Sequence, residues 1–175
     1  MTKNYARTFY LLIAFVVVVL DRWTKQLVAQ RIPLHKEIPK IRGFFYLTHT
    51  ENTGAGFSLF ANLTSPWRPA LLIAFSVIAL VVVSVLLWKN HHAHMATGIG
   101  LSLIMGGALG NLWDRVVRGR VVDFLEFYVK PLPWRLFNPW PVFNLADSAI
   151  VIGAGLLVLE ILFHKSSAHE GSQPG

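Results

Sequence analysis

Long apolar segments alternate with polar and proline-containing stretches along the chain. Four segments of the chain are predominantly apolar, and we place them at residues 8–28, 69–88, 95–114 and 143–163. Each is about 20 residues long, the length of an α-helix that crosses the hydrocarbon core of a bilayer. The pattern predicts an all-α membrane protein with four transmembrane helices. We expect one integral membrane domain over residues 1–165 and a disordered polar tail at 166–175.

The first apolar run, residues 9–20, follows two cations and has the pattern of the start of a secretory signal peptide. No small-residue cleavage site follows it. Asp21 and Lys25 come next, and apolar residues then resume, so we interpret the segment as a helix with charges near one end. Residues four apart are neighbours on a helix, so Asp21 and Lys25 either neutralise one another at the headgroup level or support a site.

Two segments between the helices favour strands. Residues 44–50 are aromatic and β-branched, Asn-Thr-Gly-Ala-Gly at 52–56 has the composition of a turn, and residues 57–60 could form a return strand. Residues 121–129 also carry strand formers. None of these segments is long enough to cross a bilayer. We therefore expect a small β-rich platform outside the membrane, next to the site.

The third apolar segment is rich in glycine and ends in charged residues. Gly106 and Gly110 are spaced for close helix packing. Asp114 follows them, with Arg115 and Arg118 within one turn, and we expect it to pair with one of these two arginines. Because a carboxylate in a salt bridge is a poor proton donor, we assign Asp114 a structural role.

Composition supports a membrane location and excludes several chemistries. The chain is 54% hydrophobic and 14% charged, too apolar for an ordinary soluble domain. It has no cysteine, which excludes disulfides, zinc thiolate sites and cysteine nucleophiles. The net charge of +7 favours contact with anionic phospholipid, while the scattered basic residues argue against nucleic-acid binding. The three histidines at 90–94 are expected in a solvated turn, with no metal and no cofactor.

Four spans would place both termini on one side and the polar loops 30–66 and 116–142 on the other. Five polar residues from separate segments then reach one membrane face, which is the sign of a site: Asp21, Asn52, Asn111, Asp123 and Asp147. Residues 22–68 hold seven of the lysines and arginines and residues 115–135 hold five. By the positive-inside rule, this count predicts that the site faces the cytoplasm.

Asp123 and Asp147 are the best candidates for catalysis. Two carboxylates in a poorly hydrated place share a proton, so one can activate water while the other protonates an amide. Motifs of rival hydrolases, such as Gly-x-Ser-x-Gly and His-Glu-x-x-His, are missing from the sequence. A structural interpretation stays open for each acid: Asp123 would pair with Arg118 or Arg120, and Asp147 would follow the helix cap Asn144.

Two other classes of protein fit part of the pattern. A small transporter or proton-conducting protein would use Asp21, Asp123 and Asp147 as relay carboxylates. A relay needs acids spaced through the bilayer, whereas these acids gather at one end and the second span has none. A membrane scaffold would tolerate Asp123→Asn and Asp147→Asn equally well.

Five motifs in order around four apolar segments resemble those of bacterial lipoprotein signal peptidase, also called signal peptidase II. They are Asp21 with Lys25, Glu-Asn-Thr-Gly-Ala-Gly-Phe at 51–57, the glycine-rich run at 106–115, Val-Val-Asp-Phe at 121–124, and Phe-Asn-Leu-Ala-Asp at 143–147. The resemblance covers essentially the whole chain through the fourth span. Gly56 departs from it, because the family more often has alanine at this position.

The resemblance implies a membrane aspartic endopeptidase that removes the signal peptide of diacylglyceryl-modified prolipoproteins, immediately before the lipidated cysteine. It implies Asp123 and Asp147 as the catalytic pair. Substrate binding is expected of Asn52, Gly54, Asn111, Arg115 and Asn144, and structural support of Asp21, Lys25 and Asp114. It also implies a location in the bacterial inner membrane and inhibition by globomycin-type lipopeptides. Separately from the resemblance, we expect a monomer. Both termini would be cytoplasmic and the site would face outward, against the charge count.

Overall fold

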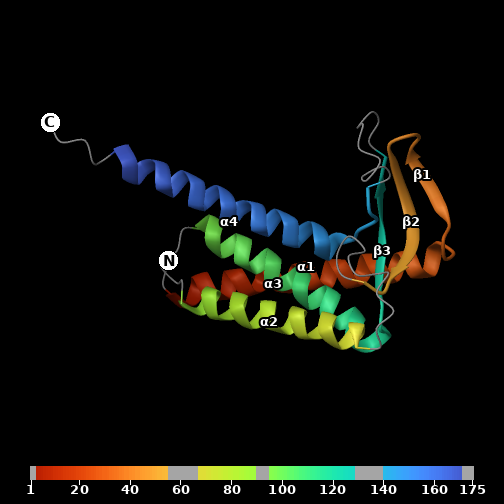
Figure 1. The fold of residues 1–175 in the computed structure, drawn as a ribbon, viewed down its shortest axis with the longest axis horizontal. Helices are drawn as coiled ribbons and strands as arrows, with labels where there is room; N and C mark the ends of the chain where they lie inside the picture. Colours follow the sequence, from red (N-terminus) through yellow and green to blue (C-terminus); the bar gives the residue numbers. More distant parts are fainter. Residues whose placement is uncertain (1–2, 55–66, 90–94, 129–139, 171–175) are drawn as a thin grey trace.

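A computed structural model describes residues 3–54, 67–89, 95–128 and 140–170. The helices and strands of these residues follow one another as α1 (Lys3–Arg31), β1 (Glu37–Ile41), β2 (Phe45–Asn52), α2 (Arg68–Lys89), α3 (Met95–Arg118), β3 (Val121–Phe127) and α4 (Leu145–Glu170). The helices extend in one general direction, and the sheet lies across one end of the bundle (Figure 1). The start of α1 and the end of α4 both lie at the opposite end.

Three helices of the described residues are long and apolar enough to cross a membrane: Pro69–Lys89, Met95–Arg118 and Leu145–Phe163. They correspond to the last three predicted spans. The helix α1 forms as predicted but does not meet the same criteria, because Asp21, Arg22 and Lys25 follow its apolar run closely. The described chain is therefore a membrane protein with three candidate spans.

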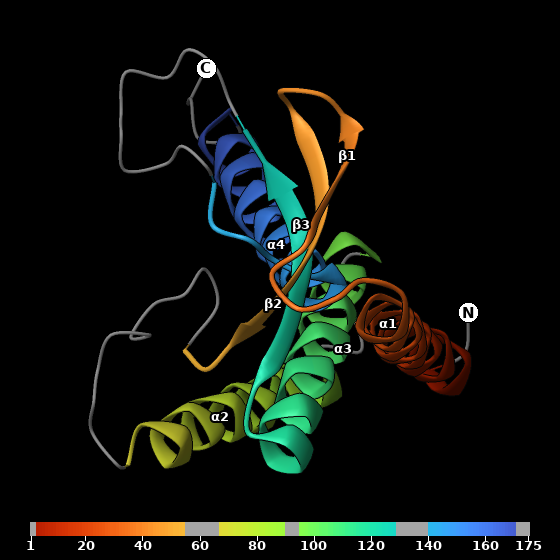
Figure 2. The ribbon, with the colours of Figure 1, turned by 90° about the vertical axis from the view of Figure 1, so that its right-hand side faces the viewer.

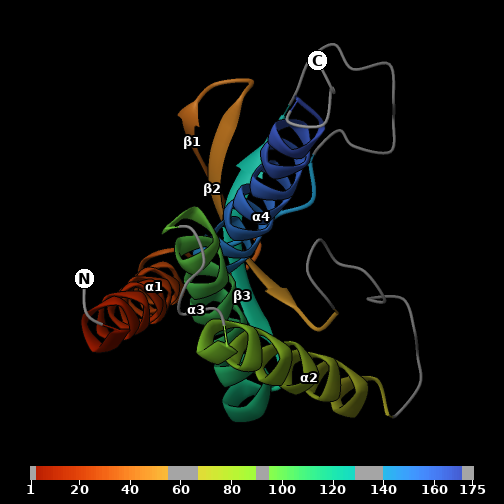
Figure 3. The ribbon, with the colours of Figure 1, turned by 90° about the vertical axis from the view of Figure 1, so that its left-hand side faces the viewer.

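The helix α3 lies at the centre, with the other three helices around it (Figure 3). Its glycines allow close approach on two sides. A Cβ atom at Gly106 would lie 2.7 Å from the carbonyl oxygen of Ala14 on α1, and one at Gly100 would lie 2.9 Å from that of Gly153 on α4. A Cβ atom at Gly110 would meet the carboxylate of Asp21. The prediction of close packing at Gly106 and Gly110 is thus confirmed.

The sheet is antiparallel with the order β1-β2-β3. Its strands β2 and β3 confirm the strand predictions at 44–50 and 121–129 within the described residues, while the predicted return strand at 57–60 lies outside them. The strand β1 was not predicted from the sequence, and it contains Pro39, a residue that strands disfavour. This strand lies at the edge of the sheet, a position that tolerates the missing N–H of a proline.

The helix α4 continues to Glu170, so residues 166–170 are helical where we expected a disordered tail. Alanine and glutamate in this segment have good helix propensity, and the helix continues beyond its apolar part. The histidine-rich segment 90–94 lies outside the described residues.

Candidate active site

Polar side chains from three helices and two strands meet where the sheet crosses the end of the bundle. The five residues that were predicted to converge are all buried there. Lys25, Asp114 and Asn144 are buried as well. The buried groups form two hydrogen-bonded clusters, one around Asp123 and Asp147 and the other around Lys25.

Asp123 lies on β3 with only 2% of its surface exposed. Its carboxylate accepts hydrogen bonds from Asn52 Nδ2 at 2.8 Å and from Asn144 Nδ2 at 2.6 Å. The expected structural partners are not the observed ones, because Arg120 instead pairs with Glu51 at 3.1 Å. Burial first, and then the charge of Asp147, raise the pKa of Asp123 to about 7.

Asp147 lies in the first turn of α4. It accepts hydrogen bonds from Asn111 Nδ2 at 2.8 Å and from the backbone N–H of Asn144 at 3.3 Å. Its own backbone N–H donates to Asn144 Oδ1 at 3.0 Å, so Asn144 caps the helix as the structural interpretation expected. The cap also holds the Asp147 carboxylate at the positive end of the helix dipole.

Asparagine amides connect the two acids. Asn144 Nδ2 contacts both Asp123 and, at 3.3 Å, Asn111 Oδ1, while Asn111 Nδ2 donates to Asp147. The path from acid to acid therefore runs through two neutral side chains. An amide can donate to a carboxylate without neutralising it by a full positive charge, so the pair is left free to exchange a proton.

The second cluster is made of charges. Lys25 Nζ lies 2.8 Å from Asp21, 2.9 Å from Asp114 and 2.9 Å from Asn111 Oδ1, and Arg22 also pairs with Asp114. Our prediction that Asp114 pairs with Arg115 or Arg118 is therefore wrong. Asp114 is buried against α1, a direction that spacing along α3 alone does not specify.

This cluster holds in place the residues that surround the carboxylate pair. The i,i+4 pair of Asp21 and Lys25 forms as predicted, and both side chains are fully buried in the protein. Asp21 also accepts a hydrogen bond from the backbone N–H of Ala146 at 3.1 Å, which fixes the start of α4 next to Asp147. Lys25 fixes Asn111 in the same way.

Gly54 and Arg115 lie at the edge of the carboxylate pair. The backbone N–H of Gly54 donates to Asn52 Oδ1 at 2.7 Å, and its carbonyl accepts from Arg115 Nη2 at 3.3 Å. The Arg115 guanidinium interacts electrostatically with both Asp147 and Asp123. All ten residues predicted for the site or its support thus lie in or beside the two clusters.

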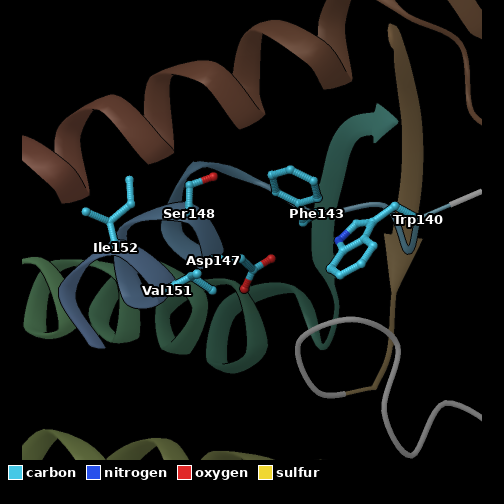
Figure 4. Close-up of a pocket in the computed structure, with 6 residues that line it drawn as sticks. All are labelled: Trp140, Phe143, Asp147, Ser148, Val151 and Ile152. Atoms are coloured by element: carbon cyan, nitrogen blue, oxygen red, sulfur yellow. The ribbon is translucent and has the colours of Figure 1, made fainter. Parts of the chain in front are cut away.

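A pocket of about 270 Å³ adjoins Asp147. Figure 4 shows its lining, which is mostly apolar: Trp140, Phe143, Asp147, Ser148, Val151 and Ile152. Apart from Asp147, none of these residues was predicted from the sequence as part of a site. The aromatic residues just before the helix and the i, i+4 spacing of Asp147 and Val151 were the available signals. Among the described residues no group of three or more His, Cys, Asp or Glu side chains could hold a metal ion.

Fold and site together define a helical membrane protein with two buried carboxylates at one end of its bundle. Comparison with known proteins identifies the family. The family model described as "Signal peptidase (SPase) II" matches residues 13–163. The chain belongs to the signal peptidase II family.

Similar proteins agree over nearly their full lengths. Proteins named lipoprotein signal peptidase from Solibacter usitatus and Symbiobacterium thermophilum are 38% and 41% identical, over 89% and 87% of this chain and 92% and 93% of their own. A solved structure described as a bacterial membrane enzyme superposes with a TM-score of 0.77 at 26% identity, covering 96% of this chain and 94% of the other. Membership of a peptidase family makes the buried acids candidates for the hydrolytic groups.

Proposed function

We propose that this protein is an aspartic endopeptidase that removes the signal peptide of diacylglyceryl-modified prolipoproteins, immediately before the lipidated cysteine. The similar proteins carry the name lipoprotein signal peptidase. One observation supports an aspartic peptidase: asparagine amides link Asp123 to Asp147 beside an apolar pocket. Acids that serve a proton relay through the bilayer would be spread along it, whereas these two lie together at one end.

Asp123 is the acid of the pair in this proposal. Its pKa of about 7, raised first by burial and then by the Asp147 charge, leaves it protonated in about half of the molecules at neutral pH. From that state it can donate to the carbonyl oxygen of the scissile amide as the tetrahedral intermediate forms. The donors Asn52 and Asn144 hold the carboxyl in one orientation.

Asp147 is the base. It draws a proton from a water molecule placed between the acids, and the resulting hydroxide adds to the carbonyl carbon. The proton then passes from Asp147 to the leaving amine as the C–N bond breaks. Asp123 takes back a proton from the hydroxyl group as the carbonyl re-forms, so the pair is again singly protonated. The end of the α4 dipole and the Asn111 amide stabilise the negative charge on Asp147 before the reaction.

The remaining polar residues would bind the substrate backbone. Asn52, Gly54, Asn111 and Asn144 present amide groups around the acids, and Arg115 supplies a positive charge near both. The buried charges of Asp21, Lys25 and Asp114 hold α1, α3 and α4 together behind them. A peptide bound mainly through its backbone needs another anchor, which the lipid of the substrate can supply at ~0.8 kcal/mol per buried CH₂.

We propose that α1 also crosses the membrane, in addition to the three candidate spans. The protein would then have four spans in a bacterial inner membrane, with residues 1–165 as one domain. Asp21 and Lys25 are buried against α3 and α4, which removes the main obstacle to placing α1 in lipid. Both termini would be cytoplasmic and the acids would lie near the outer face. The same site would bind globomycin-type lipopeptides, and the protein would work as a monomer.

Cleavage of a diacylglyceryl-modified precursor by the purified protein tests this function. We expect cleavage of the lipidated precursor before its modified cysteine and none of the unlipidated form. Equal turnover of the two forms would contradict the proposed role of the lipid. Unimpaired cleavage by Asp123→Asn would contradict the proposed acid.

A further inference from the structure

The β1–β2 hairpin, made of β1, the turn at residues 42–44 and β2, projects from the end of the bundle. Figure 1 shows its strands crossing the direction of the helices, and Figure 2 shows its turn extending past the helices between α1 and α4. The three candidate spans fix the membrane normal roughly along the helices. A hairpin that extends sideways at the end of the spans therefore lies over the lipid surface.

Large apolar side chains are exposed on this hairpin and just before it. Ile41 is 56% exposed and Phe44 is 46% exposed at the turn, and Leu34 is 47% exposed ahead of β1. Gly43 has a positive φ of 77°, which lets the chain turn tightly between the two apolar residues. An apolar tip at the level of the headgroups is favourable in a membrane interface and unfavourable in water.

Cations alternate with these apolar residues. Lys36, Lys40 and Arg42 are exposed, and none of them takes part in an ion pair between described residues. The acid of β1 is Glu37, which lies opposite Thr48 in the sheet, away from the turn. Three cations against one acid leave a formal charge of +2 on residues 36–44.

We propose that the β1–β2 hairpin binds the surface of a leaflet that contains anionic phospholipid. Ile41 and Phe44 enter the headgroup region, and Lys36, Lys40 and Arg42 bind the lipid phosphates. Binding to lipid phosphates would explain the surplus of lysine and arginine on the site face, whichever side of the membrane that face is on. The inference does not rest on the proposed peptidase activity, and its test does not measure cleavage.

Because the chain has no cysteine, one label can report the position of the hairpin. We would attach a fluorophore to Ile41→Cys in the full chain and reconstitute it in phosphatidylcholine vesicles with and without phosphatidylglycerol. Quenching by a lipid-borne quencher should rise when phosphatidylglycerol is present and fall again at high salt. The ratio of inserted to free hairpin should drop about fivefold for each cation removed, the change that ~1 kcal/mol produces.

Matched variants separate the hairpin from overall charge. Lys40→Gln should lower the anionic-lipid effect about fivefold. Lys89→Gln, which removes one charge at the far end of α2, should leave it unchanged. The triple variant Lys36→Gln, Lys40→Gln and Arg42→Gln should abolish it. Equal quenching in both kinds of vesicle, or no loss in the triple variant, would overturn the proposal. Quenching that follows the protein-to-lipid ratio would also overturn it, because a second copy would then cover the hairpin.

Discussion

Two buried polar clusters lie side by side in this protein, and they satisfy their acids in different ways. Asp21 and Asp114 are paired with Lys25 at 2.8 and 2.9 Å. Asp123 and Asp147 instead receive hydrogen bonds from asparagine amides and the backbone. A neighbouring cation favours the ionised form of an acid, while neutral donors leave its protonation easier to change. The comparison explains why one cluster suits structure and the other suits proton transfer.

The largest effect is expected from removing either acid of the amide-linked pair. Asp123→Asn and Asp147→Asn should each lower cleavage of the lipidated precursor by about 10³-fold or more, because each acid has its own proton-transfer step. The variants should remain folded, since asparagine is nearly the same size as aspartate. Cleavage rates and size-exclusion profiles of the purified variants check both parts.

The ion-paired cluster should respond in the opposite way. Asp114→Asn leaves Lys25 and Arg22 with less compensating charge, and we expect a loss of folding stability of roughly 3–5 kcal/mol. Folded yield and thermal unfolding in detergent measure this loss. Glu51→Gln is the control, because its partly exposed pair with Arg120 should contribute less than about 1 kcal/mol. A stable but inactive Asp114→Asn, beside an active Asp123→Asn, would reverse our assignment of the two clusters.

Asn111 belongs to both clusters, so changing it should produce an intermediate effect. It donates to Asp147 and accepts from Lys25. Asn111→Ala should lower activity by about 10²-fold and reduce stability by about 1–3 kcal/mol, the cost of leaving buried groups unpaired. A double-mutant cycle with Asp147→Asn should show that the activity losses are not additive. Full additivity would mean that Asn111 does not act through Asp147.

The last prediction concerns the dependence of stability on pH. The folded pKa of Asp123, about 7, lies above its ordinary value of 3.8, so the folded protein keeps a proton that the unfolded chain releases. Stability should therefore fall as the pH rises from about 4 to about 7, by up to ~1.4 kcal/mol per pH unit for this one group. Thermal unfolding across this range should show a flatter profile for Asp123→Asn. Identical profiles would show that Asp123 ionises in the folded state as readily as in the unfolded chain.

The sequence predicted what depends on composition and on the order of motifs. The apolar lengths of α2, α3 and α4, the strand formers of β2 and β3, and the convergence of polar residues at one end are all present in the structure. The prediction for the partner of Asp114 was wrong because that partner depends on how α1 is rotated against α3. The edge strand β1 and the pocket residues Trp140 and Phe143 depend on tertiary neighbours, which local propensity does not contain.

We propose that Asp123 and Asp147 act as one pair that shares a proton. A lipopeptide that places a hydroxyl between them would accept a hydrogen bond from the protonated acid and donate one to the ionised acid.

The most direct measurement is the affinity of such a lipopeptide as a function of pH, in the wild type and in Asp147→Asn. We predict tight binding that weakens as the pH rises through the apparent pKa of the pair, and much weaker binding by the variant. An affinity that is flat with pH and unchanged in Asp147→Asn would show that Asp123 and Asp147 do not share a proton at this site.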